Sequence, residues 1–494
     1  MKKLIFTTFV LSLTACDNAA TIPESVDPEL RGIINGQGLS GDASIGRNIP
    51  SIESSTAQLG MDLFFSKSLG GDQDSACVTC HHPSLGGGDN FSLSIGTESD
   101  VNDLLGPGRT NDLSINTPSF PPVPRNAPTT FNTALWDQVL FHDGRVESLG
   151  KVPKANGVGD AGIRTPNSGA FGIADPLAGD NLVQAQARFP VTSREEMKGF
   201  NHETYTDQTI REFLAGRIGG YGDAKDIDAE PLTDTDYWLE KFRTVFNQPT
   251  GTAEALITEQ NISFVIGEYE RSQVFINSPW KSYVQGDDNA ISKEAKAGAL
   301  LFFKPQSEGG ANCASCHSGD FFTDERFHNV AMPQIGSGKG DGVDGSKDFG
   351  RFRETSLETD KFAFRTPSLL NVEVTGPWSH AGAYTSLTAV VKHMTNPQMA
   401  ITNYDFAQLS QEGIQNIDKL IENTQEARDT ASFEIEELEF NDQQIENIVE
   451  FLKSLTDPCV KDRECLSAWV PDATVSDDPN GQQLNAIDEN GSLL

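Results

Sequence analysis

The sequence predicts a mainly α-helical fold made of two similar halves, with long loops between the helices. The first observation is the pattern Cys-x-x-Cys-His, which occurs at residues 77–81 and again at residues 313–317. The second is that Leu-Phe-Phe stands before each copy, at residues 63–65 and 301–303. The third is a content of 45 glycines and 25 prolines in 494 residues, which favours long loops. A repeat of this kind indicates that one ancestral unit was duplicated.

A second echo downstream of each copy supports the two-part organisation. Residues 141–149 and 379–387 have His, Gly, Ser and Leu at identical offsets. Apolar residues that gather on one face predict a helix before each Cys-x-x-Cys-His copy and another near the end of each half. These helices are expected over residues 55–65, 264–275, 292–303 and 441–455.

These patterns divide the chain into five segments. A run rich in Gly, Asn and Pro predicts a loop insertion at about residues 150–185 in the first half. The polar C-terminal tail is expected to be flexible. The predicted segments are a leader (1–15), a linker (16–50), a first domain (51–275), a second domain (276–470) and the tail (471–494).

The N-terminus has the features of a bacterial export signal. Lys2 and Lys3 precede a mostly apolar run, residues 4–13, that is too short to span a bilayer. The run ends in a Leu-Thr-Ala-Cys sequence that resembles a lipobox, so cleavage before Cys16 would leave a cysteine able to carry lipid. The alternative is an ordinary signal peptide in which Cys16 is incidental. We expect a protein on the periplasmic side of the cell envelope, held to a membrane only by lipid.

The net charge of -34 limits the possible partners. Such an acidic surface repels phosphates, which argues against non-specific binding of nucleic acid. A basic or locally complementary redox protein fits better, and a saline habitat would also explain the acidity.

The repeated pattern is the attachment signature of c-type haem. Cys77 and Cys80 can add across the two vinyl groups of one haem, while His81 binds its iron. The same groups recur in the second half as Cys313, Cys316 and His317. The alternative, a zinc site or a redox cysteine pair, does not explain a histidine directly after both copies. The halves are therefore predicted to be cytochrome-c-like domains, each with one covalently bound haem c.

Two cysteines remain near the C-terminus. Cys459 and Cys465 are expected to form a small-loop disulfide, because an exported protein meets an oxidising environment. The alternative is a reactive pair, but neither neighbourhood is cationic enough to favour a thiolate.

Three further stretches make the chain resemble a known family. They read RNAPTTFN at residues 125–132, FHDGR at 141–145 and SREEM at 193–197. Together with the paired haem motifs, they look like the bacterial di-haem cytochrome c peroxidases and the related MauG-type enzymes, which oxidise protein side chains. The resemblance runs from about Gly60 to Thr456. It leaves out the insertion in the first half and implies another in the second half, at about residues 402–435.

The resemblance implies different roles for the two haems, with peroxide at the first, electron relay at the second and a calcium ion between the domains. The family's catalytic glutamate falls on Glu196, and a glutamine of the same pocket falls on Gln186. A carboxylate above an open iron can carry a proton from one peroxide oxygen to the other. The alternative for Glu196 is an ordinary surface acid. The implied calcium ligands are Asn126, Thr375 and Pro377.

The relay haem needs a second axial ligand. In the family it follows a Pro-x-x-His segment at a fixed distance, and counting from His380 gives Met394. Methionine favours ferrous iron and raises the potential, which suits a relay. The alternatives are a packing role for Met394 with His393 as the ligand, or Met399 as the ligand.

This sequence departs from the family at two positions. Thr97 stands where many members hold a distal histidine, so we expect an open first haem at rest. His142 stands where the family has a tryptophan between the haems. It could relay electrons through hydrogen bonds, titrate, or bind the first haem. His82, directly after the proximal ligand, is expected at the surface or against a propionate.

We therefore expect a peroxidase that reduces hydrogen peroxide to water with electrons from a small cytochrome c or cupredoxin. The first alternative is a MauG-like enzyme that oxidises side chains of a partner protein. The second is a di-haem electron carrier without enzymatic activity. The resemblance also implies a homodimer, by analogy with other members.

Overall fold

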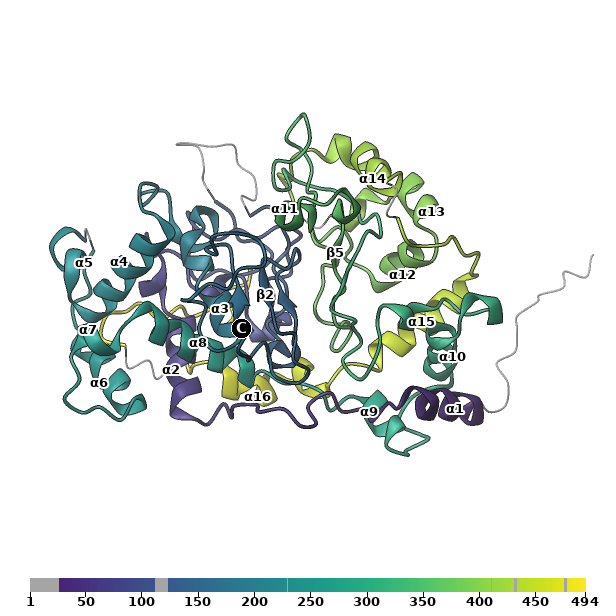
Figure 1. Ribbon diagram of the computed structural model, residues 1–494, viewed down its shortest axis with the longest axis horizontal. Coiled ribbons are helices and arrows are strands. Elements are labelled where there is room, and N and C mark those ends of the chain that lie inside the picture. Colours follow the sequence, from purple (N-terminus) through teal and green to yellow (C-terminus); the bar gives the residue numbers. More distant parts are fainter. Residues whose placement is uncertain (1–25, 112–122, 229, 410, 431–432, 475–477) are drawn as a thin grey trace, which may run out of the picture.

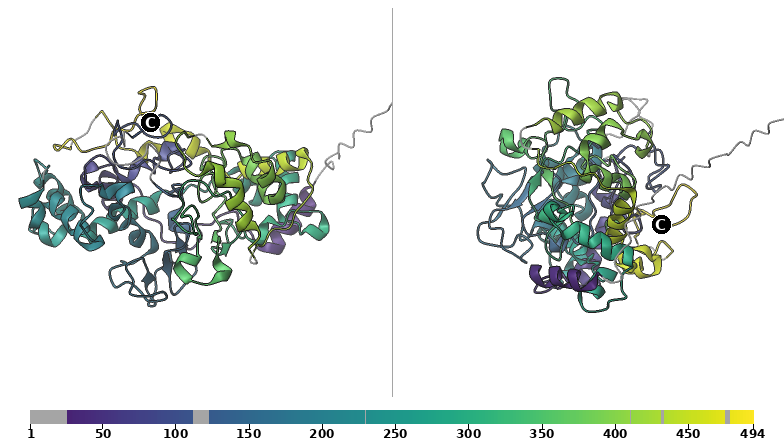
Figure 2. Two further views of the ribbon diagram at one scale, coloured as in Figure 1. Left: turned by 90° about the horizontal axis from the view of Figure 1, so that it is seen from above. Right: turned by 90° about the vertical axis from the view of Figure 1, so that its right-hand side faces the viewer.

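The computed structural model describes residues 26–111, 123–228, 230–409, 411–430, 433–474 and 478–494. The predicted leader and Cys16 lie outside these residues. Within them the chain is mostly helical with little sheet, as predicted. Figure 1 shows an elongated molecule in which the first half lies beside the second, and the views in Figure 2 agree.

The first half is organised around helix α2 (Ser55–Phe64), which packs against α8 (Glu259–Ser272). The two backbones come close at Gly60, where a Cβ atom would lie 1.9 Å from the carbonyl oxygen of Val265. Helices α4 (Asp207–Gly219) and α6 (Asp236–Val245) contribute to the same core. Because α2 leads into the first haem motif, this packing fixes where that motif begins.

The second half contains a similar helix pair. Helix α10 (Lys293–Phe303), which leads into the second motif, packs against α15 (Asp442–Lys453). Gly298 again allows the close approach, since a Cβ atom there would lie 1.8 Å from the carbonyl oxygen of Asn447. Phenylalanines of both helices are buried in this core.

The four predicted helices are present, and the largest differences are at α8, which ends at Ser272 instead of residue 275. Helix α8 starts five residues earlier than predicted, at Glu259, because the Thr258 side chain accepts a hydrogen bond from the backbone N–H of Asn261 and caps it. Helix α15 begins at a capping box formed by Asn441 and Gln444.

The N-terminal segment and the tail are more ordered than predicted. Within the predicted linker, α1 (Asp27–Gln37) packs on α10, where Lys296 pairs with Asp27 at 2.7 Å. Most of the described tail, residues 478–494, packs against the first half, where Gln483 pairs with Ser66 and Ile487 with Leu104. Its Leu484 and Ala486 are buried in the first core, and this apolar burial holds the tail in place.

Strands are few and short. Strands β1 (Val139–Leu140), β2 (Val146–Ser148) and β3 (Ile163–Arg164) form an antiparallel sheet, and β4 (Phe327–His328) pairs with β5 (Phe364–Arg365). Among the described helices, none has the length and apolar character that crossing a membrane requires. The remaining α-helices are α3 (Leu182–Ala187), α5 (Gly222–Ile227), α7 (Ala253–Leu256), α9 (Pro279–Val284), α11 (Phe352–Thr355), α12 (Leu387–Thr395), α13 (Pro397–Thr402), α14 (Leu420–Arg428) and α16 (Arg463–Leu466).

Candidate functional site

The first haem motif brings two thiols and an imidazole to one cavity. Cys77, Cys80 and His81 line a cavity of about 80 Å³, called here the first cavity. His81 bonds through Nδ1 to the carbonyl of Gly87 at 3.1 Å. Burial lowers the pKa of His81, so the ring is neutral. With Nδ1 held by a carbonyl, Nε2 is the nitrogen available to a metal.

The second motif has the same construction in a larger space. Cys313, Cys316 and His317 line a cavity of about 650 Å³, called here the second cavity. His317 bonds through Nδ1 to the carbonyl of Phe322 at 3.1 Å. Burial lowers its pKa as well. In both motifs a backbone carbonyl sets the orientation of the imidazole.

These donor sets fit covalently attached haem. Each offers two thiols for the vinyl groups and one neutral imidazole for the iron. The second cavity is far larger than the first, so the side chains around His81 would have to move apart to admit a porphyrin. The two cavities adjoin, since residues including Asn126, Phe141 and His142 line both.

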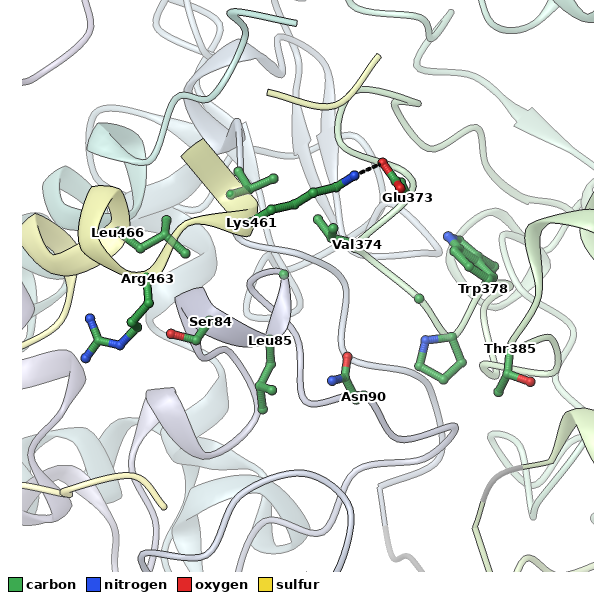
Figure 3. A pocket seen from close by; sticks show the side chains of 14 residues that line it. Ser84, Leu85, Asn90, Glu373, Val374, Trp378, Thr385, Lys461, Arg463 and Leu466 are labelled. Atoms are coloured by element: carbon green, nitrogen blue, oxygen red, sulfur yellow. Dashed lines mark ion pairs between the residues drawn. The ribbon is translucent and has the colours of Figure 1, made fainter. Parts of the chain in front are cut away.

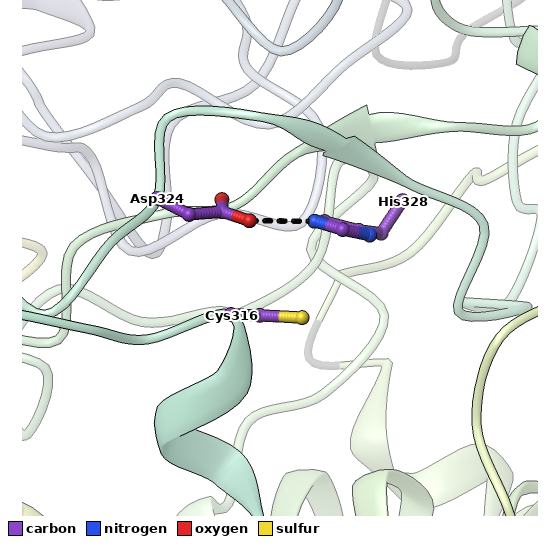
Figure 4. Close-up of side chains that lie close together, drawn as sticks. All are labelled: Cys316, Asp324 and His328. Atoms are coloured by element: carbon purple, nitrogen blue, oxygen red, sulfur yellow. Dashed lines mark hydrogen bonds and ion pairs between the residues drawn. The ribbon is translucent and has the colours of Figure 1, made fainter.

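One cluster beside the second motif offers ligands of the kind that zinc takes. Single ligand atoms of Cys316, Asp324 and His328 lie within 4.8 Å of one another (Figure 4). Both nitrogens of His328 are already engaged, with Asp324 at 2.8 Å and with Glu434 at 2.5 Å. The hydrogen bonds with Asp324, Cys316 and Glu434 raise the pKa of His328 to about 11. A protonated imidazole is not a metal ligand, so this is an ion-pair cluster.

Glu196 lies in the first cavity together with His81, as its predicted role requires. It sits on a single π-helical turn, Arg194–Lys198. Burial raises the pKa of its carboxyl. Thr97 stabilises this turn with two hydrogen bonds. Its hydroxyl donates to the carbonyl of Arg194 at 3.0 Å, and its backbone N–H donates to the carbonyl of Glu195. A carboxyl with a raised pKa beside a ligand-binding face can accept and return a proton.

Met394 is on α12 and lines the second cavity with His317. The rival His393 is fully buried, and both of its nitrogens are engaged, with the Tyr384 hydroxyl at 2.8 Å and the Val330 carbonyl at 2.9 Å. Met399 is 59% exposed. The structure therefore favours Met394 over both rivals. Met332, which the sequence did not single out, also lines the second cavity.

The predicted calcium ligands Asn126, Thr375 and Pro377 all line the second cavity. The carbonyls of Thr375 and Pro377 accept no hydrogen bond within the described ranges. Pro377 also borders an open cleft of about 510 Å³ on the other side, where Lys461 pairs with Glu373 and Trp378 forms part of the wall (Figure 3).

Comparison with known proteins relates this chain to a family of haem enzymes. Residues 54–289 match the family described as di-haem cytochrome c peroxidase. The chain is 26% identical over 337 residues to the methylamine utilization protein MauG of Methylorubrum extorquens, covering 68% of this chain and 67% of that protein. It is 26% identical over 360 residues to the cytochrome c551 peroxidase of Pseudomonas aeruginosa, covering 73% and 75%. The first half of the chain therefore matches the di-haem cytochrome c peroxidase family, and the similarity to MauG and to cytochrome c551 peroxidase extends over 68% and 73% of the chain.

Solved structures support the fold of a di-haem peroxidase. The diheme peroxidase BthA from Burkholderia thailandensis aligns with a TM-score of 0.51 at 16% identity, over 90% of this chain and 92% of that one. A MauG-like protein associated with microbial copper homeostasis aligns with a TM-score of 0.54 at 19% identity, over 85% and 96%.

Two residues near the first haem motif, Thr97 and His82, are buried. Thr97 is fully buried, and its hydroxyl donates a hydrogen bond to the turn that carries Glu196. His82 is also fully buried, so the prediction of a surface position is wrong. Its Nδ1 accepts from the N–H of Ser84, and its ring packs edge-on against Phe65. Capping this turn draws the ring inward.

His142 lies between the cavities and lines both. Its Nε2 bonds to the carbonyl of Asn126 at 3.0 Å, which argues against that nitrogen as a haem ligand. Burial, Arg125 and Arg365 lower its pKa to about 3. The imidazole is therefore neutral at physiological pH, and the predicted titration does not occur there.

Gln186, which the resemblance assigns to the pocket of Glu196, lines the second cavity, whereas its neighbour Ala187 lines the first. The sequence also missed Glu270 of α8, a buried carboxyl that lines both cavities. Burial raises its pKa to about 8. Arg145 and Lys339 were missed in the first cavity, and only Arg145 lies within a recognisable motif, FHDGR.

Proposed function

We propose that this enzyme reduces hydrogen peroxide to water at the first cavity, with electrons from a small cytochrome c or cupredoxin. The observation that carries the proposal is that Glu196 and His81 line one cavity. Apart from His142, whose Nε2 is occupied, no other imidazole lines that cavity among the described residues. A haem held by His81 would then have a face open to peroxide.

A haem held by Cys77, Cys80 and His81 would supply the redox-active iron that peroxide reduction requires. The protein's own groups handle the protons. Glu196 accepts a proton from the nearer peroxide oxygen and returns it to the farther one, which leaves as water. Arg145 lines the same cavity, where its positive charge favours the ionised form of Glu196.

The second cavity suits an electron relay. His317 and Met394 line this cavity and would hold its haem iron, whose potential a methionine sulfur would raise. His142 and its hydrogen bond to Asn126 form a bridge between the two cavities. We include this bridge in the proposed path, in place of the tryptophan of other members.

Several expectations from the sequence belong to the same proposal. These are an internal duplication, a calcium ion on Asn126, Thr375 and Pro377, a lipid at Cys16, a periplasmic location and a homodimer. The similar helix pairs α2–α8 and α10–α15 support the duplication. The unpaired carbonyls of Thr375 and Pro377 support the calcium ion, because oxygen ligands suit calcium.

A MauG-like activity on a partner protein is the second candidate. The relatives named MauG favour it, as does the lining of the first cavity, where the only imidazoles among the described residues are His81 and the hydrogen-bonded His142. Met394 argues against it, because the family resemblance implies that MauG-type enzymes have a tyrosine at this position.

The test mixes haem-loaded protein with a reduced small cytochrome c and hydrogen peroxide. We expect two molecules of donor to be oxidised for each peroxide reduced. No donor oxidation above the uncatalysed rate would contradict the proposal. Oxidised side chains on a co-purified partner, found by mass spectrometry without donor turnover, would favour the MauG-like alternative. If neither the donor nor a partner is oxidised, the protein is an electron carrier without enzymatic activity.

A further inference from the structure

The wall of the first cavity includes a lysine from the second half of the chain. Residues 336–350 form a loop that crosses from the second half, and its Lys339 lines the cavity with His81 and Glu196. Within the described ranges, the Lys339 ammonium makes no hydrogen bond or ion pair with another side chain. Lys347 of the same loop, by contrast, pairs with Glu426.

The backbone around Lys339 is held in place. Arg353 donates to the carbonyl of Lys339 at 3.2 Å. Gly338 has a φ of +51°, and a Cβ atom there would lie 2.6 Å from the carbonyl of Lys347, so only glycine suits this position. Asp348, at the end of the loop, forms two hydrogen bonds with Arg125 of the first half. The lysine is therefore presented to the cavity by a fixed loop.

The groups around Lys339 leave it charged and without a competing partner. Arg145 is stacked on Phe141 and paired with Asp143. Arg125 forms ion pairs with Asp143 and Asp348. Burial, Arg145 and Arg125 lower the pKa of Lys339 to about 8, so most of the ammonium stays protonated at neutral pH.

Two opposite charges thus line one cavity without being paired to each other. The Glu196 carboxylate can accept a hydrogen bond and the Lys339 ammonium can donate one. A small molecule with two oxygens, each able to donate and accept, can bridge them. Hydrogen peroxide has this character.

We propose that Lys339 is a catalytic residue that binds peroxide opposite Glu196 and donates a hydrogen bond to the oxygen that leaves. The proposal rests on the peroxidase function above. The O–O bond breaks, and one peroxide takes two electrons and two protons to give two waters. The electrons come singly from the reduced redox protein, and the protons come from solvent. Lys339 stabilises the negative charge on the leaving oxygen and keeps its own proton.

The test measures how tightly the haem-loaded protein binds azide, an anionic probe of the open face, from the shift of the haem absorption band. In Lys339→Met, we expect azide affinity and the second-order rate with peroxide each to fall by about ten- to a hundredfold, as for loss of a charge-assisted hydrogen bond. Lys339→Arg should restore most of both. The affinity for neutral imidazole should not change.

Lys347→Met is the matched control, because it removes the same charge from the same loop outside the cavity, and it should behave as wild type. Unchanged azide affinity in Lys339→Met would overturn the proposal even if the enzyme is a peroxidase. If wild type oxidises no donor while azide affinity still depends on Lys339, the peroxidase function fails and Lys339 is left as an anion-binding residue only. The two failures are therefore distinguishable.

Discussion

Arg125 of the first half and Asp348 of the second form a buried bidentate ion pair, with 2.6 Å from Nε to Oδ2 and 2.8 Å from Nη2 to Oδ1. Arg125 also donates to Asp143 at 2.6 Å. Because Asp348 ends the loop that carries Lys339, this pair fixes a residue of the second half over the first cavity. The proposed peroxide site is therefore built by residues of both halves.

Breaking this pair should destabilise the protein strongly. In Asp348→Asn, Arg125 loses one of its two carboxylate partners in a place that water does not reach, and we expect a loss of about 3 kcal/mol. The urea midpoint of the haem-loaded protein measures it. Asp344→Asn is the control, since Asp344 pairs with Lys419 at the surface of the same loop and its loss should leave the midpoint unchanged. Equal midpoints for both variants and wild type would contradict the prediction.

The same pair predicts a dependence on acid. Burial alone would raise the pKa of Asp348, but the charge of Arg125 and their hydrogen bonds lower it below the ordinary value. Its contribution to stability is therefore present above the unfolded pKa of about 3.9 and is lost as the pH falls below it. Between about pH 6 and pH 3, the urea midpoint of wild type should fall further than that of Asp348→Asn. Parallel curves would show that Asp348 does not contribute in this way.

Glu196→Gln should remove proton transfer and keep the site. We expect peroxide reduction to slow by about a hundredfold or more, with haem content unchanged. Because burial raises the pKa of Glu196, the acid limb of the wild-type rate profile should lie above that of an ordinary carboxyl. The neighbouring Glu195→Gln, which removes a partner of Arg194 on the surface, is the control and should keep wild-type rates. Full activity in Glu196→Gln would rule out its role.

Met394→Leu should open the second haem. Loss of the sulfur ligand should lower the reduction potential of that haem and convert its low-spin absorption spectrum to a high-spin one. Met332→Leu, which changes the same residue type in the same cavity, should do neither. If Met332→Leu instead gives the high-spin spectrum, Met332 is the ligand.

Local sequence patterns were enough to predict the parts that local chemistry determines. The spacing of Cys77, Cys80 and His81 predicts a haem motif because the attachment reaction itself requires that spacing. The helices that precede both motifs follow from apolar periodicity. Glu196 and Met394 could be placed only through the family resemblance, which supplied their distances from other motifs.

What could not be predicted depends on contacts between distant segments. Lys339 reaches the first cavity through the Arg125–Asp348 pair, whose partners are 223 residues apart in the chain. Gln186 and Ala187 are adjacent in sequence but line different cavities, which depends on how α3 packs. His82 looked like a surface residue because its packing against Phe65 is not visible in the sequence. The tail packs against the first half because Leu484 is buried in a core whose other members are mostly more than 200 residues away in the sequence.

The central claim is that the two haems differ, the first open at His81 and the second closed by His317 and Met394. The resting electron paramagnetic resonance spectrum of the haem-loaded protein tests this most directly, because it counts high-spin and low-spin ferric haems. We predict one of each, with the high-spin signal lost when azide is added. Two low-spin haems at rest would contradict the account, because a protein ligand would then close the face on which peroxide must bind.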